Sequence, residues 1–314
     1  MRAMVFPRYG GPEVLEAAEL ELPVPAANQV LIRVEASSIN PIDWKRASGA
    51  LRLLMPARLP LVPGYDVAGT VSALGPGVST FKVGDRVHAR IGESRGGACA
   101  EFALAGLDVV TRMPDGMSMG DAAALPLAGM TALQGLRDAG GLPMECPKAR
   151  VLVVGASGGV GHFAVQLAKG MGAHVTGICS GRNVDLVRSL GADEVLDYTK
   201  PGVLQGHSGF DLVLDCVGAD AAKWLPLVRD GGRYASTIPG PAVLLRQVVN
   251  PLTSKGVHAV LLKSRAVDLA LLDRWFEAGR LRVVIDSRFP LAKLGEAWAK
   301  SITGRSAGKI VIDV

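Results

Sequence analysis

A strand, a glycine-rich turn and a helix follow one another over residues 150–169, and this stretch constrains the fold more than any other. Residues 150–154 read Arg-Val-Leu-Val-Val, an apolar and mostly β-branched run that is typical of a buried parallel strand. After the glycines, apolar residues recur with helical spacing at Val160, Phe163 and Leu167. The order of these elements predicts the start of a doubly wound α/β domain that binds a dinucleotide.

The turn reads Ala-Ser-Gly-Gly-Val-Gly over residues 156–161, with alanine where a dinucleotide fingerprint has its first glycine. We expect Gly158 to let the backbone approach a pyrophosphate and Gly161 to let the helix pack closely on the strand. The N–H groups at the helix start, at the positive end of its dipole, would bind the phosphates. The alternative is a tight turn without a ligand. The residues expected to contact the cofactor here are Ser157, Gly158, Gly159, Val160 and Gly161.

Length and composition predict about two globular domains. The chain has 314 residues, of which 49% are hydrophobic and 20% charged, as in soluble proteins with sizeable cores. The net charge is only +5, and Lys and Arg are scattered, so neither a nucleic-acid arm nor a membrane-binding segment is expected. An N-terminus without a signal-peptide core, and the absence of a long apolar run, predict a cytoplasmic protein. Reduced thiols without metal-ligand spacing are expected for Cys99, Cys146, Cys179 and Cys216.

The order of the elements divides the chain into a β-rich part and an α/β part. Up to about residue 120, short strands such as 30–36 and 67–74 alternate with Gly- and Pro-rich turns, which indicates a compact β-barrel-like domain. Beyond that point, helices alternate with strands, which indicates a doubly wound parallel sheet. The strands expected in this second part are 150–154, 175–179, 211–215 and 233–237.

Two further expectations concern a helix terminus and the C-terminal tail. Asn183 is expected to cap a helix over 184–190 that Gly191 ends. From about residue 266, two helices and two strands follow. The last strand has no evident partner in the preceding part, so we expect it to return to the N-terminal domain.

The end of the second expected strand indicates which nicotinamide cofactor binds. An NAD site usually has Asp or Glu about 20 residues after the glycines, but residues 178–183 contain no carboxylate. Ser180 can donate to a phosphate oxygen and Arg182 can form a charge-assisted fork to it, which favours NADPH. The alternative is a solvated turn and helix cap. Tyr198 could lie over the adenosine side of the cofactor, or it could be an ordinary half-buried tyrosine.

Several motifs spread along the chain occur together in one known family. They include Asn-Pro-Ile-Asp-Trp-Lys-Arg at 40–46, Pro-Gly-Tyr-Asp at 63–66, Gly-Met-Thr-Ala-Leu at 129–133, Ser-Leu-Gly-Ala-Asp at 189–193 and Gly-Lys-Ile-Val-Ile at 308–312. With these motifs the chain resembles the medium-chain dehydrogenase/reductase superfamily, in its zinc-free, zeta-crystallin-like quinone oxidoreductase branch.

The resemblance implies the architecture of the whole chain. A GroES-like β-barrel catalytic domain of residues 1–120 is completed by 266–314, and a Rossmann NADP-binding domain spans 121–265. The resemblance also implies a catalytic cleft where the domains meet and a homodimer.

The zinc alcohol dehydrogenases of this superfamily have a Cys near the position of Ile39 and Asn40. They have Gly-His-Glu where this chain has Gly64, Tyr65 and Asp66. Without Cys or His at these positions no metal is predicted. Losing the Lewis acid disfavours alcohol oxidation. We therefore expect NADPH-dependent hydride transfer to a quinone or an α,β-unsaturated carbonyl, whose new charge needs only a hydrogen-bond donor and protonation.

Three residues are expected to be catalytic. Lys45 would donate to the substrate oxygen or to the nicotinamide ribose, unless it is a surface lysine. Tyr65 could face the substrate or be a packed aromatic residue, and Asn40 could line the cleft or, with Asp43, hold the loop. Lys45 is also expected among the cofactor contacts, which are completed by Thr131, Ser180, Arg182, Tyr198, Val217 and Lys309.

Two other functions remain open. An enoyl-thioester reductase of the same fold would need a basic cleft mouth, which Arg46, Arg52 and Arg58 make possible. A non-catalytic protein that binds NADPH or RNA, as the resemblance to zeta-crystallins suggests, is disfavoured for nucleic acid by the scattered charge. No ligand spacing is found among His88, His162, His174, His207 and His258.

Overall fold

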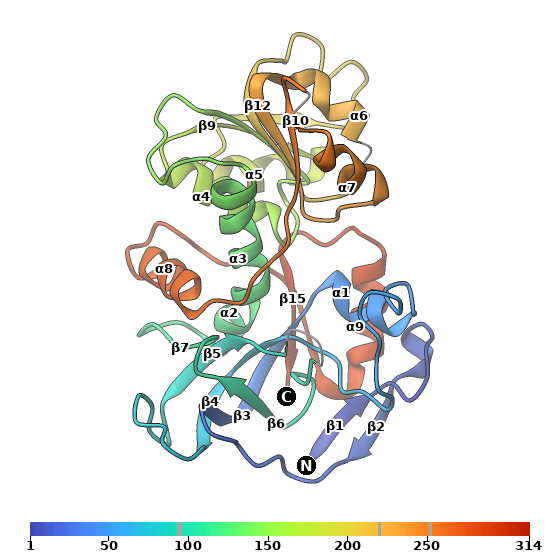
Figure 1. Ribbon diagram of the computed structural model, residues 1–314, viewed down its shortest axis with the longest axis vertical. Helices are drawn as coiled ribbons and strands as arrows, with labels where there is room; N and C mark the ends of the chain where they lie inside the picture. The colour runs from blue at the N-terminus through green and yellow to red at the C-terminus, as the bar shows by residue number, and fades with distance from the viewer. Residues whose placement is uncertain (93–95, 219–220, 251–252) are drawn as a thin grey trace. The chain divides into compact units, whose positions relative to one another are not determined.

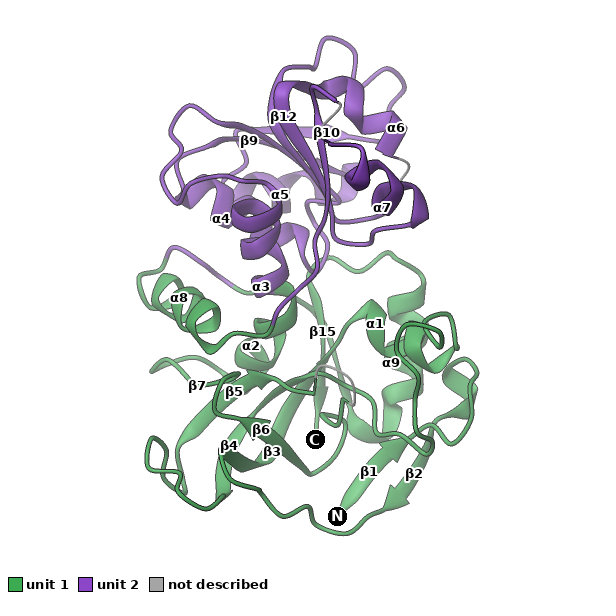
Figure 2. Ribbon diagram, viewed as in Figure 1, with its two compact units in different colours: residues 1–128, 264–279, 283–314 green, residues 129–263, 280–282 purple. Residues whose placement is uncertain are grey.

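The computed structural model describes residues 1–92, 96–218, 221–250 and 253–314 (Figure 1). Its contacts divide the chain into two compact units, which Figure 2 shows in different colours. Unit 1 consists of residues 1–128, 264–279 and 283–314, and unit 2 of residues 129–263 and 280–282.

Unit 2 is built on a parallel sheet, and its strand order confirms the expected doubly wound fold. In chain order the strands lie as third, second, first, fourth, fifth and sixth, which is the Rossmann arrangement. Every neighbouring pair in this sheet runs parallel. Across the sheet the strands are β10 (Glu194–Asp197), β9 (His174–Cys179), β8 (Arg150–Val154), β11 (Phe210–Asp215), β12 (Val228–Ser236) and β13 (Gly256–Ala259).

The turn between β8 and helix α4 (Gly161–Gly170) depends on two glycines. Gly155 has a φ of 75°, a left-handed conformation that favours glycine, so it makes the turn one residue before the position occupied by Ala156. A Cβ on Gly161 would lie 2.1 Å from the carbonyl oxygen of Gly155. The helix therefore approaches the strand as closely as expected from the sequence, and only glycine fits at that point.

The helices of unit 2 cover different strands. Contacts place α4 and α5 on β8, β9 and β10, whereas α6 and α7 pack on β12 and β13. Buried side chains such as Trp224 and Tyr234 fill the core beside the sheet. The helices are α3 (Pro126–Gln134), whose residues 126–128 belong to unit 1 and which continues as the π-helix η2 (Gly135–Ala139), α4, η3 (Gly181–Asn183), α5 (Val184–Ser189), α6 (Ala221–Trp224), η4 (Leu225–Leu227) and α7 (Pro241–Val248).

Unit 1 contains a mostly antiparallel sheet and a two-stranded ribbon. The long strand β3 (Gln29–Ile39) pairs with β4 along nearly its whole length. On its other edge it pairs with β6 along its first part and with the C-terminal strand β15 along its last part. The C-terminal strand therefore belongs to unit 1, and its only parallel neighbour in the described sheet is β14. The remaining strands are β1 (Arg2–Val5), β2 (Glu16–Glu19), β4 (Asp66–Leu74), β5 (Arg86–Arg90), β6 (Phe102–Gly106), β7 (Val110–Arg112), β14 (Ile285–Pro290) and β15 (Lys309–Asp313).

Short helices surround this sheet. Trp298 is fully buried with Phe6, Ile39 and Ile312, and its helix α9 thereby closes one of the two apolar clusters of unit 1. The other cluster consists of small and β-branched side chains from β3 to β7. The helices of unit 1 are η1 (Pro12–Val14), α1 (Pro41–Ala47), α2 (Met119–Ala124), α8 (Ala266–Glu277), η6 (Leu291–Lys293) and α9 (Leu294–Ile302).

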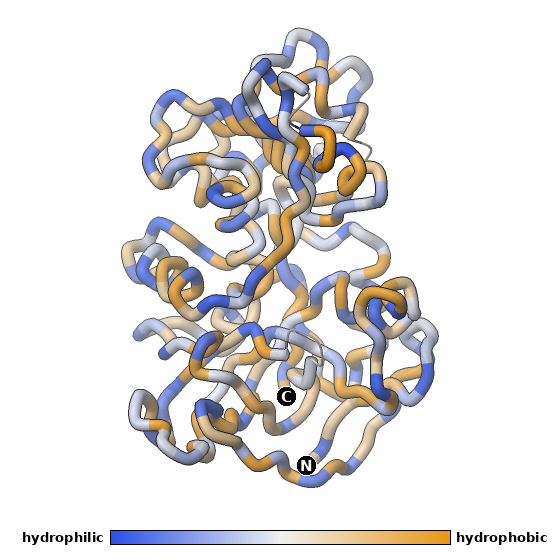
Figure 3. The backbone as a smooth tube through the Cα atoms, in the orientation of Figure 1, coloured by the Kyte–Doolittle hydropathy of each residue, from blue (hydrophilic) through white to orange (hydrophobic). Residues whose placement is uncertain are grey.

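Apolar side chains are also found on the outside of the chain. Helix α7 is largely hydrophobic in Figure 3, although Leu245 and Val248 are 71% and 75% exposed. Within the described ranges, no helix is both long enough and apolar enough to span a bilayer.

The close approach at Gly161 predicts the effect of one methyl group. In Gly161→Ala the new Cβ would meet backbone atoms of Gly155 and Ala156 that cannot rotate away. We expect the free energy of unfolding to fall by about 1–3 kcal/mol, measured by denaturant titration. The control is Gly295→Ala, a glycine within α9 whose Cβ would have its nearest contact at 3.4 Å. Equal stability of the two variants would contradict the packing argument.

Candidate functional site

The turn after β8 leaves room where a ligand is expected. At Gly158 an added Cβ would meet only the Gly155 carbonyl oxygen within 4 Å, at 3.3 Å, and Gly158 does not have a positive φ. The backbone conformation therefore does not demand glycine at this position, and the one contact of an added Cβ is tight but far longer than the 2.1 Å found at Gly161. The side of Gly158 is otherwise open, which fits close approach by a pyrophosphate. Val160 is at the N-cap position of α4.

Asn183 joins this turn to the turn after β9. It occupies the N-cap position of α5, but its side chain makes no capping hydrogen bond, so the expected cap is wrong. Instead its amide donates to the hydroxyl oxygens of Ser157 at 2.9 Å and Ser180 at 3.3 Å. The helix still ends as expected, with Gly191 in a left-handed conformation. Two predicted cofactor residues from different turns are thereby brought together.

Other predicted cofactor residues surround these two turns. Arg182 is exposed, and Tyr198 is 60% exposed, with its N–H donating to the carbonyl oxygen of Cys179 at the end of β9. Val217 is 57% exposed after β11, where its N–H donates to Asp215. All of these positions follow the carboxyl ends of strands, where ligands bind in doubly wound sheets.

A carboxylate that the sequence did not place here lies beside the second turn. An added Cβ at Gly181 would lie 2.6 Å from Oδ2 of Asp197, at the end of β10. Hydrogen bonds from Thr199 lower the pKa of Asp197 below its usual value, so this group is charged at neutral pH. Any phosphate bound near Ser180 and Arg182 would therefore have this negative charge nearby.

In unit 1 the predicted residues Asn40 and Lys309 meet at the buried carboxylate of Asp66. Asp66 accepts hydrogen bonds from the Ser38 hydroxyl and the Asn40 side-chain amide, both at 2.8 Å. The Lys309 ammonium lies 3.7 Å from the same carboxylate and donates to the Asn40 side-chain oxygen at 2.5 Å and to the Ile39 carbonyl oxygen at 3.1 Å. Asn40, Asp66 and Lys309 are each at most 2% exposed.

These contacts hold the side chains of Asn40 and Lys309 in the interior of unit 1. The side-chain N–H of Asn40 donates to Asp66, and its side-chain oxygen accepts from Lys309. The ammonium of Lys309 is surrounded by oxygen acceptors. Burial lowers the pKa of Lys309, while the charges of Asp66 and Asp43 oppose that shift. Direct contact of Asn40 with substrate, or of Lys309 with cofactor, stays a prediction.

The same group does not fit a zinc ion. The positions at which zinc dehydrogenases have their ligands carry Asn40, Tyr65 and Asp66, and a lysine ammonium donates into that set. Zinc sites use thiolate, imidazole and carboxylate ligands around the metal, and a buried ammonium would repel the ion. No cluster of three or more potential metal ligands occurs in the part of the chain that the structure describes.

Helix α1 carries a buried face and a partly exposed one. Asp43 and Arg46 lie three residues apart and are 2% and 3% exposed, whereas Lys45 between them is partly exposed. The Lys45 ammonium lies 5.5 Å from the Trp44 ring centroid, and burial lowers its pKa. No ion pair of Lys45 is found among the described residues, so its ammonium is a suitable donor to a ligand oxygen.

Asp43 is the carboxyl group whose ionisation the fold changes most clearly. Its Oδ2 accepts from the Asn40 N–H at 2.7 Å, whereas Oδ1 is buried without a hydrogen-bond partner among the described residues. Burial raises the pKa of Asp43 to about 7, and the charge of Asp66 adds to the shift. A neutral Asp43 leaves Asp66 as the one charged partner of Lys309.

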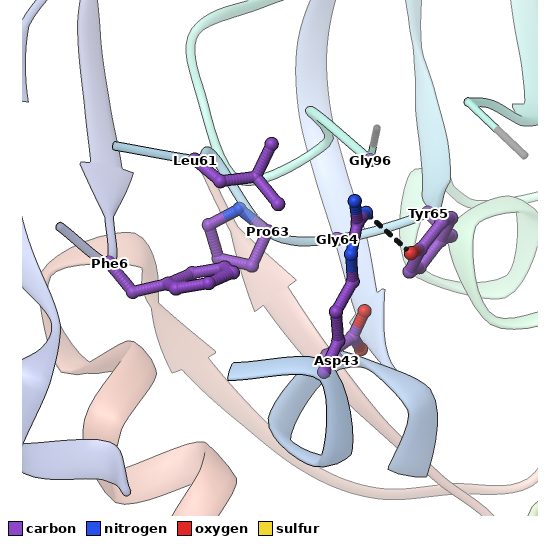
Figure 4. A pocket seen from close by; sticks show the side chains of 8 residues that line it. Phe6, Asp43, Leu61, Pro63, Gly64, Tyr65 and Gly96 are labelled. Carbon is purple, nitrogen blue, oxygen red and sulfur yellow. Dashed lines mark hydrogen bonds between the residues drawn. The ribbon is translucent and has the colours of Figure 1, made fainter. Parts of the chain in front are cut away.

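Tyr65 is buried rather than open to solvent. Its hydroxyl accepts a hydrogen bond from Arg46 at 2.9 Å, and the Arg90 guanidinium lies 5.5 Å from its ring centroid. Burial raises the pKa of Tyr65, so the hydroxyl keeps its proton. A narrow pocket without room for a water molecule is lined by Phe6, Asp43, Arg46, Leu61, Pro63, Gly64, Tyr65 and Gly96. Figure 4 shows this pocket from close by.

Helix α3 links Asp66 to the last predicted residue. The N–H of Leu127, in the first turn of α3, donates to Asp66 Oδ1 at 2.8 Å. Thr131 follows on the same helix and is 6% exposed. The predicted residues therefore form two groups, one in each unit. The sequence analysis missed Asp66 as an organising residue, whereas it named Asp43 as a residue that holds the loop and Asn183 as a helix cap.

The raised pKa of Asp43 predicts a pH-dependent difference in stability. Between about pH 4 and pH 7 the folded protein holds this proton more tightly than the unfolded chain, so the stabilisation it gives is lost as the pH rises through 7. Asp43→Asn removes the titration. We therefore expect the melting temperature of this variant, relative to wild type, to increase between pH 5 and pH 8.

The control for this measurement is Asp115→Asn, at an exposed position. Its melting temperature relative to wild type should be the same at both pH values. A pH-independent difference for Asp43→Asn as well would show that Asp43 ionises normally in the folded protein.

Two known protein families match this chain, one over most of its N-terminal part and one over its C-terminal part. The family described as "Alcohol dehydrogenase GroES-like domain" matches residues 26–130, and "Zinc-binding dehydrogenase" matches residues 190–312. The chain is 41% identical to a "Chloroplast envelope quinone oxidoreductase homolog" of Arabidopsis thaliana, covering 100% of this chain and 98% of that protein. It is 35% identical to human "NAD(P)H oxidoreductase RTN4IP1, mitochondrial" and to tomato (Solanum lycopersicum) "2-methylene-furan-3-one reductase". These cover 100% and 99% of this chain, and 89% and 79% of the relatives.

Solved structures agree with this assignment. The quinone oxidoreductase of Coxiella burnetii superposes with a TM-score of 0.92 at 31% identity, over 100% of this chain and 99% of that one. A mycobacterial protein solved in complex with NADPH has a TM-score of 0.84 at 28% identity, over 100% of both chains.

The relatives also overturn one expectation. A cytoplasmic location was expected, but the Arabidopsis relative is named for the chloroplast envelope and the human relative for the mitochondrion. The absence of a signal-peptide core therefore did not justify a cytoplasmic assignment. Full-length similarity at this level, together with both matching domains, shows that the chain belongs to the medium-chain dehydrogenase/reductase superfamily, in its quinone oxidoreductase branch.

Proposed function

We propose that this protein is an NADPH-dependent oxidoreductase that reduces a quinone or an α,β-unsaturated carbonyl without a metal ion. Membership of the branch makes it an NAD(P)H oxidoreductase with a nicotinamide cofactor. The choice of NADPH and of the acceptor is the further step. For the acceptor, relatives are named for a quinone and for 2-methylene-furan-3-one, whose name describes an unsaturated ketone.

The arrangement at the turn after β9 carries the proposal for NADPH. Ser180 lies at the end of β9 with its hydroxyl turned toward Asn183, and the exposed Arg182 follows two residues later. A guanidinium and a hydroxyl suit a phosphate on the ribose. Asp197 argues for NADH instead, because a carboxylate beside this turn could accept hydrogen bonds from unphosphorylated ribose hydroxyls.

The chemistry assigns different tasks to the two units. When bound, the nicotinamide supplies a hydride to the acceptor. In unit 2, the turn at Gly158 and the turn at Ser180 would hold the cofactor's phosphates. In unit 1, Lys45 would donate a hydrogen bond to the acceptor oxygen as negative charge develops there, and the neutral Tyr65 hydroxyl is a second donor close to α1.

One alternative within this fold loses part of its support. An enoyl-thioester reductase was considered because Arg46, Arg52 and Arg58 could attract a phosphorylated carrier. Arg46 is buried and donates to Tyr65, so only Arg52 and Arg58 of the three are exposed. A small acceptor is therefore the better proposal.

An acceptor panel tests the reaction. We expect purified protein to oxidise NADPH with small quinones or small enones, and Lys45→Met to lower kcat about tenfold or more by removing a charged hydrogen-bond donor. A Lys45 that instead contacts the nicotinamide ribose would raise the KM for NADPH at nearly unchanged kcat. Lys82→Met, at an exposed lysine, is the control. Absence of turnover with every acceptor would refute the proposed reaction.

Removal of Arg182 tests the cofactor. Losing one charge-assisted contact costs about 1.5–3 kcal/mol, so Arg182→Ala should raise the apparent KM for NADPH tenfold or more and leave NADH nearly unchanged. Arg188→Ala is the matched control, because Arg188 is exposed and pairs with Asp185 at 3.0 Å. A wild-type preference for NADH would indicate that Asp197 determines the choice. An Arg182→Ala variant that still prefers NADPH would show that Arg182 does not determine it.

A further inference from the structure

We infer that Asn183 is the positioning residue that gives this protein its preference for a phosphorylated ribose. It would do so by turning the hydroxyl protons of Ser157 and Ser180 toward the phosphate groups of the cofactor. The inference rests on the proposed use of NADPH. It adds a residue that touches neither phosphate in the proposal and acts only through the two serines.

The hydrogen bonds of the Asn183 amide decide how the two serine hydroxyls are oriented. The side-chain amide of Asn183 has two N–H donors, and one is directed to each serine oxygen, at 2.9 Å for Ser157 and 3.3 Å for Ser180. A hydroxyl that accepts in this way still has its own proton to donate. The structure shows no acceptor for either proton among the described residues. Both serines are therefore arranged as donors, which is what an anion requires.

The two serines lie in turns that follow neighbouring strands. Ser157 follows β8 in the glycine-rich turn, where a pyrophosphate is expected, and Ser180 directly follows β9, where a phosphate on the ribose is expected. The strands are neighbours in the parallel sheet, with Val154 opposite Ile178, so both turns emerge at the same edge. Asn183 spans these turns and couples them through one side chain.

Asn183 is held in place by its own backbone. Its backbone N–H donates to the carbonyl oxygen of Ser180 at 2.9 Å, which closes the short helix η3. Because its side chain does not cap α5, the amide is available for the serines. An asparagine at the N-cap usually satisfies helix N–H groups, so its diversion to two hydroxyls indicates a different task.

Equilibrium binding tests the inference without relying on turnover. The probes are 2′,5′-ADP (adenosine 2′,5′-bisphosphate), which carries the ribose phosphate, and 5′-AMP, which lacks only that group, both titrated calorimetrically into the full-length protein. We expect wild type to bind 2′,5′-ADP more tightly. Asn183→Ala should weaken 2′,5′-ADP binding about tenfold and 5′-AMP binding much less. Asn183→Asp should weaken it further, because a carboxylate accepts both hydroxyl protons and adds negative charge.

A double-mutant cycle separates positioning from simple proximity. If Asn183 acts through Ser180, then Ser180→Ala should weaken 2′,5′-ADP binding in the wild type but have little further effect in Asn183→Ala. Ser189→Ala, at an exposed serine that ends α5, is the control, and should leave binding unchanged in both backgrounds. Thermal melting of each variant shows whether it is folded.

The outcomes distinguish this inference from the proposed function. Wild type that binds 5′-AMP as tightly as 2′,5′-ADP would overturn both. Loss of 2′,5′-ADP binding in Arg182→Ala, with wild-type binding in folded Asn183→Ala, would overturn only the role of Asn183. Additive effects of Asn183→Ala and Ser180→Ala would show that the two residues act independently, which also overturns it.

Discussion

The structure of unit 1 depends on the hydrogen bonds and the ion pair of one buried carboxylate, that of Asp66. It connects the first residue of β4 with the end of β3 through Ser38 and Asn40, with β15 through Lys309, and with the first turn of α3 through Leu127. A charge that is 0% exposed is stable only when it is paired and hydrogen-bonded, so every one of these segments must be in place. The site in this unit is therefore assembled by distant parts of the chain that share one buried anion.

The same carboxylate is paired with a cation that belongs to the chain. Lys309 supplies this positive charge, and the raised pKa of Asp43 favours its neutral form below about pH 7, which reduces the negative charge buried beside Asp66. Burial of two carboxylates against one ammonium would otherwise leave a charge unpaired, which is costly in a dry interior. Helix α1, which carries Lys45, begins at this cluster, where the Asn40 N–H donates to Asp43.

In unit 2, backbone geometry rather than a buried charge determines the shape of the site. Gly161 lets α4 start against β8, so the turn at 155–161 has a defined shape, and Asn183 then ties that turn to the end of β9. The elements that create this arrangement were predictable from sequence, because a β-branched run, glycines and helical spacing are local patterns. The parallel, doubly wound sheet followed from the alternation of strands and helices, and the unpartnered last strand indeed pairs with β3.

What sequence could not show is which side chains meet across long separations. Asp66 and Lys309 lie far apart in the chain, and nothing local to either residue indicates a buried ion pair. Asn183 was read as a helix cap because its type and position suit one, and tertiary contacts with two serines prevailed over that preference. Asp197 was missed for a similar reason, since it reaches the second turn from a neighbouring strand rather than from the same one.

A crystal structure with NADPH bound is the measurement that tests this account most directly. The account predicts density for the pyrophosphate over the turn at Gly158 and for the ribose phosphate between Ser180 and Arg182, with both serine hydroxyls donating to phosphate oxygens. A ribose phosphate directed into solvent, or ribose hydroxyls bound to Asp197, would contradict it.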